Sequence, residues 1–195
     1  MDQNEIERVI ASTMWDIVVQ HTGNVGYRGA TKREGLAYDP PVIDCSGWAA
    51  MLLTSAMEAI NSASRSEVFN SEYRASIATW SDRMIALVEA RVGAILNGEE
   101  ISLANLPPYA LIGLRQGGGA WANNHPRKRG ITHVAQIVRR PTDRAPFISE
   151  SQGWARPHGL RLTELGEWLD LTRPWLKAGE AWAVDPFAPP VDTRC

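Results

Sequence analysis

The stretch Asp44-Cys45-Ser46-Gly47-Trp48 separates a loop-like segment from one that is rich in alanine, methionine and leucine. Asp44 is placed to cap a helix that begins at the cysteine, because aspartate accepts hydrogen bonds from the free N–H groups of a first helical turn. Those N–H groups and the positive end of the helix dipole favour thiolate over thiol. They can also receive the oxyanion of an acyl-transfer intermediate. The stretch therefore predicts a nucleophilic cysteine at the start of a helix.

A thiolate of this kind needs a base, and His133 is the histidine that falls inside a predicted strand, residues 131–138. A polar residue on the next predicted strand, residues 147–151, is expected to orient the imidazole and fix its tautomer. Ser149 and Glu150 are the candidates there, and they face opposite ways because side chains alternate along a strand. Taken alone, a cysteine at a helix start is more often a small buried hydrophobe. The pairing with a strand histidine favours catalysis.

The periodicity along the chain places helices before strands. Apolar residues recur at helical spacing over residues 5–21, 45–60 and 71–96. This order is typical of an α+β fold with an antiparallel sheet, against which we expect the nucleophile helix to pack. We expect strands over 109–114, 131–138, 147–151 and 181–184, and a short helix over 163–171 capped by Thr163. The first helix should be capped by Asp2 or Asn4. The segments between the elements should be an irregular loop over 24–41 and a polar break over 61–66, and the chain should end in an extended tail over 186–195.

Length and composition limit the class of protein. A chain of 195 residues predicts a single domain over residues 1–195, and 44% hydrophobic with 22% charged residues is ordinary for a globular protein. The 20 basic and 22 acidic side chains leave a net charge of -2, which argues against a nucleic-acid partner. No apolar stretch is long enough for a membrane span, and no signal-peptide pattern is visible.

The cysteine and histidine content limits the kinds of site. Two cysteines, Cys45 and Cys195, exclude a disulfide framework and a thiolate zinc cluster. No pair of histidines has the spacing of a metal site, so we expect neither a metal nor a cofactor. A disulfide between the two cysteines is an alternative that the lack of secretory marks disfavours. We expect a monomer with no membrane partner.

The order of these motifs resembles the NlpC-type cysteine peptidases of the papain-like superfamily, which cleave amide bonds in the peptide stems of bacterial cell walls. The resemblance rests on residues 44–47 and 133–135, with weaker matches at 26–29 and 111–114. It departs from the family in a longer spacing between the tyrosine and cysteine motifs. It departs again in a helical insertion over 66–98.

The resemblance implies a papain-like fold and a role for each matching residue. Cys45 is the nucleophile, His133 the general base, and Tyr27 lines the oxyanion side. We assign Glu150 as the third member, because a carboxylate holds an imidazolium better than a hydroxyl does. Ser149 and His158 are the alternatives for that position. The residues expected on the substrate or oxyanion side are Tyr27, Asp44, Ser46 and Ser149.

The expected function is cysteine-dependent hydrolysis of an amide bond, with a peptidoglycan peptide as the substrate. One alternative is an acyltransferase or amidase that uses the same Cys–His pair on a substrate outside the wall. Another is an inactive binding module. Wall substrates lie outside the cytoplasm, and no leader is visible. We therefore expect delivery to the periplasm or outside by a secretion system or phage particle, as for an antibacterial toxin with a neutralising immunity protein.

Overall fold

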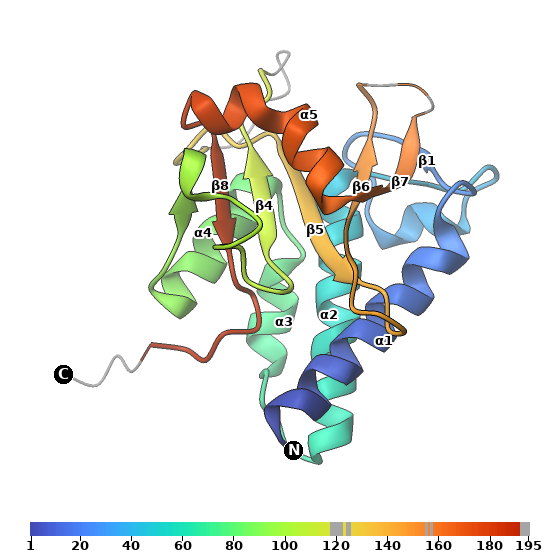
Figure 1. The fold of residues 1–195 in the computed structure, drawn as a ribbon. Helices are drawn as coiled ribbons and strands as arrows, with labels where there is room; N and C mark the ends of the chain where they lie inside the picture. Colours follow the sequence, from blue (N-terminus) through green and yellow to red (C-terminus); the bar gives the residue numbers. More distant parts are fainter. Residues whose placement is uncertain (118–122, 124–125, 155, 157, 192–195) are drawn as a thin grey trace.

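The computed structural model describes residues 1–117, 123, 126–154, 156 and 158–191. These residues form an α+β fold whose main sheet has six strands. The strands of the main sheet follow the order β3-β8-β4-β5-β6-β7, and every neighbouring pair is antiparallel (Figure 1). The predicted α+β class with an antiparallel sheet is therefore confirmed. The strands are β3 (Leu96–Asn97), β4 (Leu111–Leu114), β5 (His133–Arg139), β6 (Pro146–Gln152), β7 (Gly159–Glu164) and β8 (Ala181–Val184).

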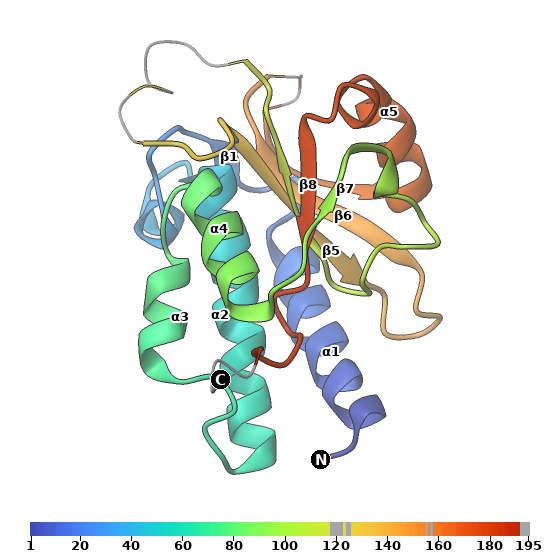
Figure 2. The same ribbon diagram turned by 90° about the vertical axis from the view of Figure 1, so that its left-hand side faces the viewer.

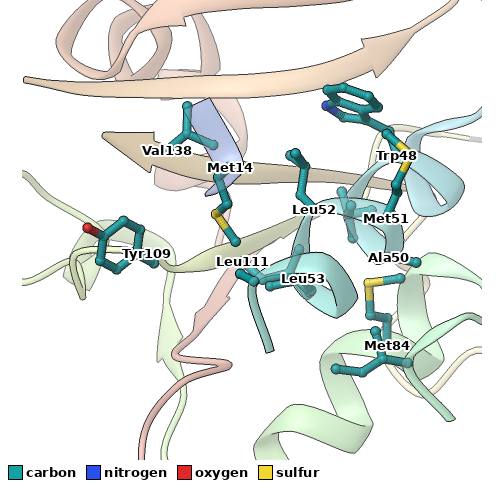
Figure 3. Packing of buried hydrophobic residues seen from close by; sticks show 14 of the residues in the cluster. Met14, Trp48, Ala50, Met51, Leu52, Leu53, Met84, Tyr109, Leu111 and Val138 are labelled. Atoms are coloured by element: carbon teal, nitrogen blue, oxygen red, sulfur yellow. The ribbon is translucent and has the colours of Figure 1, made fainter. Parts of the chain in front are cut away.

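Alternating side chains give the sheet two apolar faces. One face packs against the long helices α1 (Gln3–His21) and α2 (Cys45–Ser64), and the other packs against α5 (Leu165–Lys177) (Figure 2). Along β4, for example, Leu111 belongs to the first cluster and Ile112 to the second. Figure 3 shows the first cluster, in which Met14, Leu52 and Leu53 meet beside Leu111. Burial on both faces makes the sheet the centre of the molecule.

Helix α2 begins where the sequence predicts. Asp44 is its N-cap, and one carboxylate oxygen accepts the N–H of Gly47 at 2.6 Å. Its apolar side packs against β5 and β6, as expected of a nucleophile helix. The predicted break over 61–66 is only partly correct, because the helix continues to Ser64 and ends at Arg65 in the left-handed conformation. Helix α1 is capped by Asp2, which decides between the two predicted caps.

The predicted long helix over 71–96 is wrong. The structure has two helices, α3 (Ser71–Ile77) and α4 (Ser81–Val92), and the chain then enters β3. The apolar stripe is real in both helices, but Trp80 is extended and caps α4. The side chain of Asp82, in the first turn of α4, accepts three backbone N–H groups from residues 128–131, so this helix start is attached to a distant loop.

Two further segments differ from the sequence expectations. The segment over 24–41 contains β1 (Gly26–Tyr27), which pairs in parallel with β2 (Val42–Ile43), and a 3-10 helix η1 (Arg33–Ala37). Residues 159–164 form β7, so Thr163 is a strand residue rather than a helix cap. The strand over 181–184 is confirmed at both ends. A further 3-10 helix, η2 (Gly98–Glu100), follows β3.

After β8 the chain turns at residues 186–188 and then runs without regular structure to residue 191, where the Val191 N–H donates to the carbonyl of Arg91 at 2.9 Å. The expected extended tail over 186–195 is therefore wrong at its start, where the chain turns. Residues 192–195, with Cys195, lie outside the described residues. Among the described residues, no helix is long and apolar enough to cross a membrane.

Candidate active site

Cys45 is the first residue of α2 and lines a cavity of about 690 Å³. Its side chain is mostly covered, with 6% of the residue exposed. The helix start is held by the Asp44 cap and by the Asp44 backbone N–H, which donates to the carbonyl of Thr31 at 2.8 Å. The predicted position of the thiol at a helix N-terminus is confirmed. The thiol therefore opens into a cavity while its backbone is fixed.

His133 is the first residue of β5 and is bonded to Glu150 of β6. The imidazole Nε2 and the carboxylate Oε2 lie 2.6 Å apart, and both residues are buried, at 4% exposed each. The other carboxylate oxygen, Oε1, accepts the indole N–H of Trp168 on α5 at 3.3 Å. A charge buried to this extent is stable only when it is paired and hydrogen-bonded, and both conditions are met here.

Ser149, the alternative third member, faces the opposite side of the sheet. Its hydroxyl accepts the indole N–H of Trp48 on α2 at 2.9 Å. The expectation that Ser149 lies on the substrate or oxyanion side is therefore wrong, because side chains alternate along β6. His158, the other alternative, is exposed just before β7. The third-member position beside the His133 imidazole is occupied by the Glu150 carboxylate.

The thiol and the imidazole form a coupled pair. Burial raises the pKa of the Cys45 thiol, but a hydrogen bond and the charge of His133 outweigh burial, and the net shift is downward. Burial lowers the pKa of His133, yet the hydrogen bonds to Cys45 and Glu150 prevail and raise it to about 10. With Nε2 held by Glu150, Nδ1 is the ring nitrogen left for the sulfur. The two shifts have a common cause, because each group stabilises the charged form of the other.

Tyr27 lies near the Cys45–His133 pair because its strand, β1, pairs in parallel with β2, which leads into α2. Tyr27 lies opposite Ile43 in the pairing of β1 with β2, which carries its ring to the start of α2 despite the long spacing in sequence. Burial, followed by the charges of Cys45 and Asp44, raises the pKa of its hydroxyl to about 12. The phenol is therefore protonated at neutral pH and able to donate a hydrogen bond. The predicted neighbourhood of Tyr27 and Cys45 is present.

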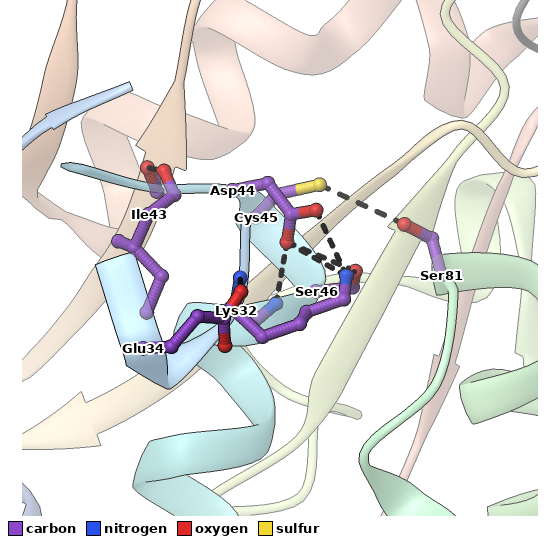
Figure 4. Close-up of polar contacts among 9 residues, drawn as sticks. Lys32, Glu34, Ile43, Asp44, Cys45, Ser46 and Ser81 are labelled. Carbon is purple, nitrogen blue, oxygen red and sulfur yellow. Dashed lines mark hydrogen bonds and ion pairs between the residues drawn. The ribbon is translucent and has the colours of Figure 1, made fainter. Parts of the chain in front are cut away.

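Lys32 is a member of the site that the sequence analysis missed. Its ammonium donates to both carboxylate oxygens of Asp44, at 3.0 and 2.8 Å, and to the hydroxyl of Ser46 (Figure 4). Ser46 also donates to Asp44 at 3.1 Å. The expected placement of Asp44 and Ser46 at the cavity is confirmed, since both line it together with Lys32. No local pattern points to a lysine so far before the cysteine, because the loop that carries it is positioned by tertiary contacts.

A second cavity of about 380 Å³ lies on the histidine side. Tyr27 and Thr132 line both cavities, so the two adjoin across the Cys–His pair. Trp154 and Trp175 contribute to the second wall. A substrate chain can thus extend to either side of the reacting sulfur.

Three consecutive basic residues, Arg127-Lys128-Arg129, lie in the loop that borders the cleft. Arg127 lines the first cavity and donates to the carbonyl of Ile131 at 2.6 Å. Lys128 and Arg129 instead pair with Glu89 of α4. The run therefore contributes one cation to the cleft, and its other two attach the loop to α4.

Ser81 is a second contact that the sequence analysis missed. It is the first residue of α4, and its hydroxyl oxygen lies 3.7 Å from the Cys45 sulfur.

Among the described residues, no group of three or more His, Cys, Asp or Glu side chains is arranged to hold a metal ion.

Searches against protein-family models, curated proteins and solved structures found no match for this chain. The functional conclusion rests on the geometry of the site and on the motifs.

Proposed function

We propose that this protein is a cysteine-dependent amide hydrolase of papain-like architecture that cleaves peptide stems of bacterial peptidoglycan. One observation carries the proposal: a cysteine at a helix N-terminus is paired with a buried histidine, which a carboxylate holds at 2.6 Å. The order of nucleophile, histidine and orienting group is that of the NlpC-type resemblance. A nucleophile, a base and an orienting group within reach of one another are the parts that covalent acyl transfer requires.

Acylation begins when the Cys45 thiolate attacks the carbonyl carbon of the scissile amide and a carbon–sulfur bond forms. The carbonyl oxygen becomes an oxyanion, which the free N–H groups at the start of α2 and the Tyr27 hydroxyl stabilise. The His133 imidazolium then gives its proton to the amide nitrogen. The carbon–nitrogen bond breaks and the amine product departs, so the acyl group remains on the Cys45 sulfur as a thioester.

Deacylation reverses the roles of the same groups. His133, now neutral, takes a proton from a water molecule that attacks the thioester carbonyl. The carbon–sulfur bond breaks, the acid product is released, and the thiolate–imidazolium pair is restored. Glu150, bonded to Nε2 of His133, stabilises the imidazolium in each half-reaction.

The cleft supports a peptide as the substrate. Cavities adjoin on both sides of the reacting pair, so residues before and after the scissile bond have space. The polar lining of the first cavity, which includes Lys32, Asp44 and Arg127, suits a substrate with charged groups of both signs. The peptide stems of cell walls carry such groups.

Mass analysis of purified wall fragments tests the proposal. Wild type should release new amino groups from the fragments, while Cys45→Ala and His133→Ala should each lose activity by a factor on the order of 10³ or more, because nucleophile and base act as a unit. Cys195→Ser is the control, since it changes the other thiol and should retain activity. Unchanged release by Cys45→Ala would sink the proposal.

Competing amines separate hydrolysis from acyl transfer. Fragments treated in the presence of a small amine should still give the free acid as the main product if water is the acceptor. Dominant capture by the amine would instead favour the acyltransferase alternative, which uses the same thioester.

A further inference from the structure

Ser81 contacts the reacting sulfur from the segment that the family resemblance does not cover. Its hydroxyl oxygen lies 3.7 Å from the Cys45 sulfur, and the residue is only 4% exposed. Figure 4 shows the hydroxyl at the start of α4 aimed at the sulfur, which projects from the start of α2. The sulfur therefore lies between the N-termini of two helices.

The position of Ser81 is fixed by its neighbour in sequence. The buried carboxylate of Asp82 accepts the backbone N–H groups of Lys128, Arg129 and Ile131 at 2.8, 2.9 and 3.0 Å. Ile131 is two residues before His133. The same contact thus holds the start of α4 and the chain that leads into the histidine strand. Ser81 and His133 are positioned together, on elements far apart in sequence.

The chemistry of the sulfur sets the direction of the Ser81 hydrogen bond. Either group can donate when the sulfur is a thiol, whereas a thiolate carries no proton and can only accept, so the serine hydroxyl is the donor to the thiolate form. Hydrogen bonds to charged groups are stronger than those between neutral groups. The contact therefore stabilises the thiolate in one orientation.

We propose that Ser81 is a positioning residue for the nucleophile, whose hydroxyl donates to the Cys45 thiolate and holds the sulfur toward the cleft. The inference rests on the proposed function insofar as it takes Cys45 to be the nucleophile. Ser81 acts through Cys45 and needs no contact with the substrate.

The charged and titratable groups around the sulfur come from several elements. His133 of β5 stabilises the thiolate, and Glu150 behind it raises the pKa of His133, while the Asp44 carboxylate opposes the thiolate. The other groups near the sulfur or the cavity that it lines are Tyr27 of β1, Lys32 on Asp44, Arg127 of the cavity wall, and Asp82, whose carboxylate is occupied by three N–H groups. Ser81 is uncharged, so replacing it tests the hydrogen bond without changing the charge of the site.

The test measures the rate at which iodoacetamide alkylates Cys45 as a function of pH, with the site of modification identified by peptide mass. Ser81→Ala should move the midpoint of the profile upward by about one pH unit, the shift expected for one hydrogen bond to a charge. Ser81→Thr retains a hydroxyl and should restore the wild-type midpoint. Ser71→Ala is the matched control, because Ser71 is also the first residue of a helix but is exposed.

Each outcome decides something distinct. A Ser81→Ala profile that superimposes on wild type, with circular dichroism and thermal unfolding unchanged, would overturn the role of Ser81. A folded Ser81→Thr that behaves like Ser81→Ala would overturn it too. Wild type that shows no enhanced reactivity at Cys45 would remove both the nucleophile and the inference. A shifted profile in a protein that releases no amines from wall fragments would support Ser81 and reject the proposed substrate.

Discussion

At the scale of single residues, the site depends on which side chain holds the imidazole. Glu150 does so at 2.6 Å, while Ser149 faces α2 and bonds to Trp48. A carboxylate stabilises the imidazolium, and this is why the pKa of His133 is raised to about 10 although burial alone would lower it. The imidazolium can therefore protonate a leaving amine across the neutral range.

Glu150→Gln should lower kcat by a factor of about 10², because the amide keeps the shape but loses the charge that stabilises the imidazolium. In wild type, His133 stays protonated until the pH approaches about 10, so amide cleavage should decline as the pH rises through that value. Loss of the carboxylate lowers the pKa of His133, and the decline should begin at lower pH. Steady-state rates between pH 5 and 11 measure both effects.

Ser149→Ala is the matched control for Glu150→Gln, since it changes the neighbouring residue on the opposite face of β6. Its pH profile should follow wild type, although the lost acceptor for Trp48 lowers stability by about 1–3 kcal/mol. A shifted profile in Ser149→Ala with none in Glu150→Gln would reverse the assignment of the third member.

At the scale of elements, carboxylates fix the two helix N-termini that meet at the sulfur. Asp44 caps α2 from outside the helix, and its second role is to bind Lys32. Asp82 lies inside the first turn of α4 and binds the loop over 128–131. Each helix start is thereby placed by an acidic side chain, in the position where a helix dipole favours negative charge.

Asp44→Ala should lower the free energy of unfolding by about 1–2 kcal/mol, because the first turn of α2 loses its cap. Asp44→Asn should retain most of that stability, since asparagine caps as well as aspartate does. Removing the Asp44 charge also lowers the pKa of Cys45, which the carboxylate raises. Urea unfolding and thiol alkylation measure the two effects.

Asp2→Ala provides the comparison at a second helix. Asp2 caps α1 through the Glu5 N–H at 2.8 Å, in an exposed position far along the chain from the cleft. The substitution Asp2→Ala should lower the free energy of unfolding by about 0.5–1 kcal/mol and leave thiol reactivity unchanged. Equal stability of Asp44→Ala and Asp44→Asn would contradict the capping role.

At the scale of the whole molecule, the cleft forms where distant parts of the chain meet. Tyr27 borders both cavities, and its ring packs directly on Gly153, just after β6. A methyl group on Gly153 would stand 2.4 Å from the ring, so only glycine leaves room for it. The contact connects the β1 segment to the end of the strand that carries Glu150.

Gly153→Ala should displace the Tyr27 ring and lower kcat/KM by about 10- to 100-fold, the range expected when an oriented group is moved by about 1 Å. Steady-state kinetics on wall fragments measure the loss. Gly166→Ala is the control, because a methyl group there meets nothing within 4 Å. It should leave activity intact and add up to about 1 kcal/mol of helix stability in α5. Equal activity in the two variants would remove Tyr27 from the site.

Features that depend on neighbours in the chain could be predicted from the sequence. The cap at Asp44, the start of α2 at Cys45, the strand that carries His133 and the strand over 181–184 all follow from local hydrogen bonding and apolar periodicity. These features, with the α+β class, were predictable because short-range geometry decides them.

The remaining features depend on contacts between segments that are far apart in sequence. Apolar periodicity runs through residues 77–84, yet α3 ends at Ile77 and α4 starts at Ser81, and Asp82 next to that start binds a loop some 45 residues later. The choice of Glu150 over Ser149 depends on which face of β6 meets His133. The contacts of Lys32 and Ser81 with the α2 start join separate elements. Such contacts have no local signature, because they form only when the sheet brings distant segments together.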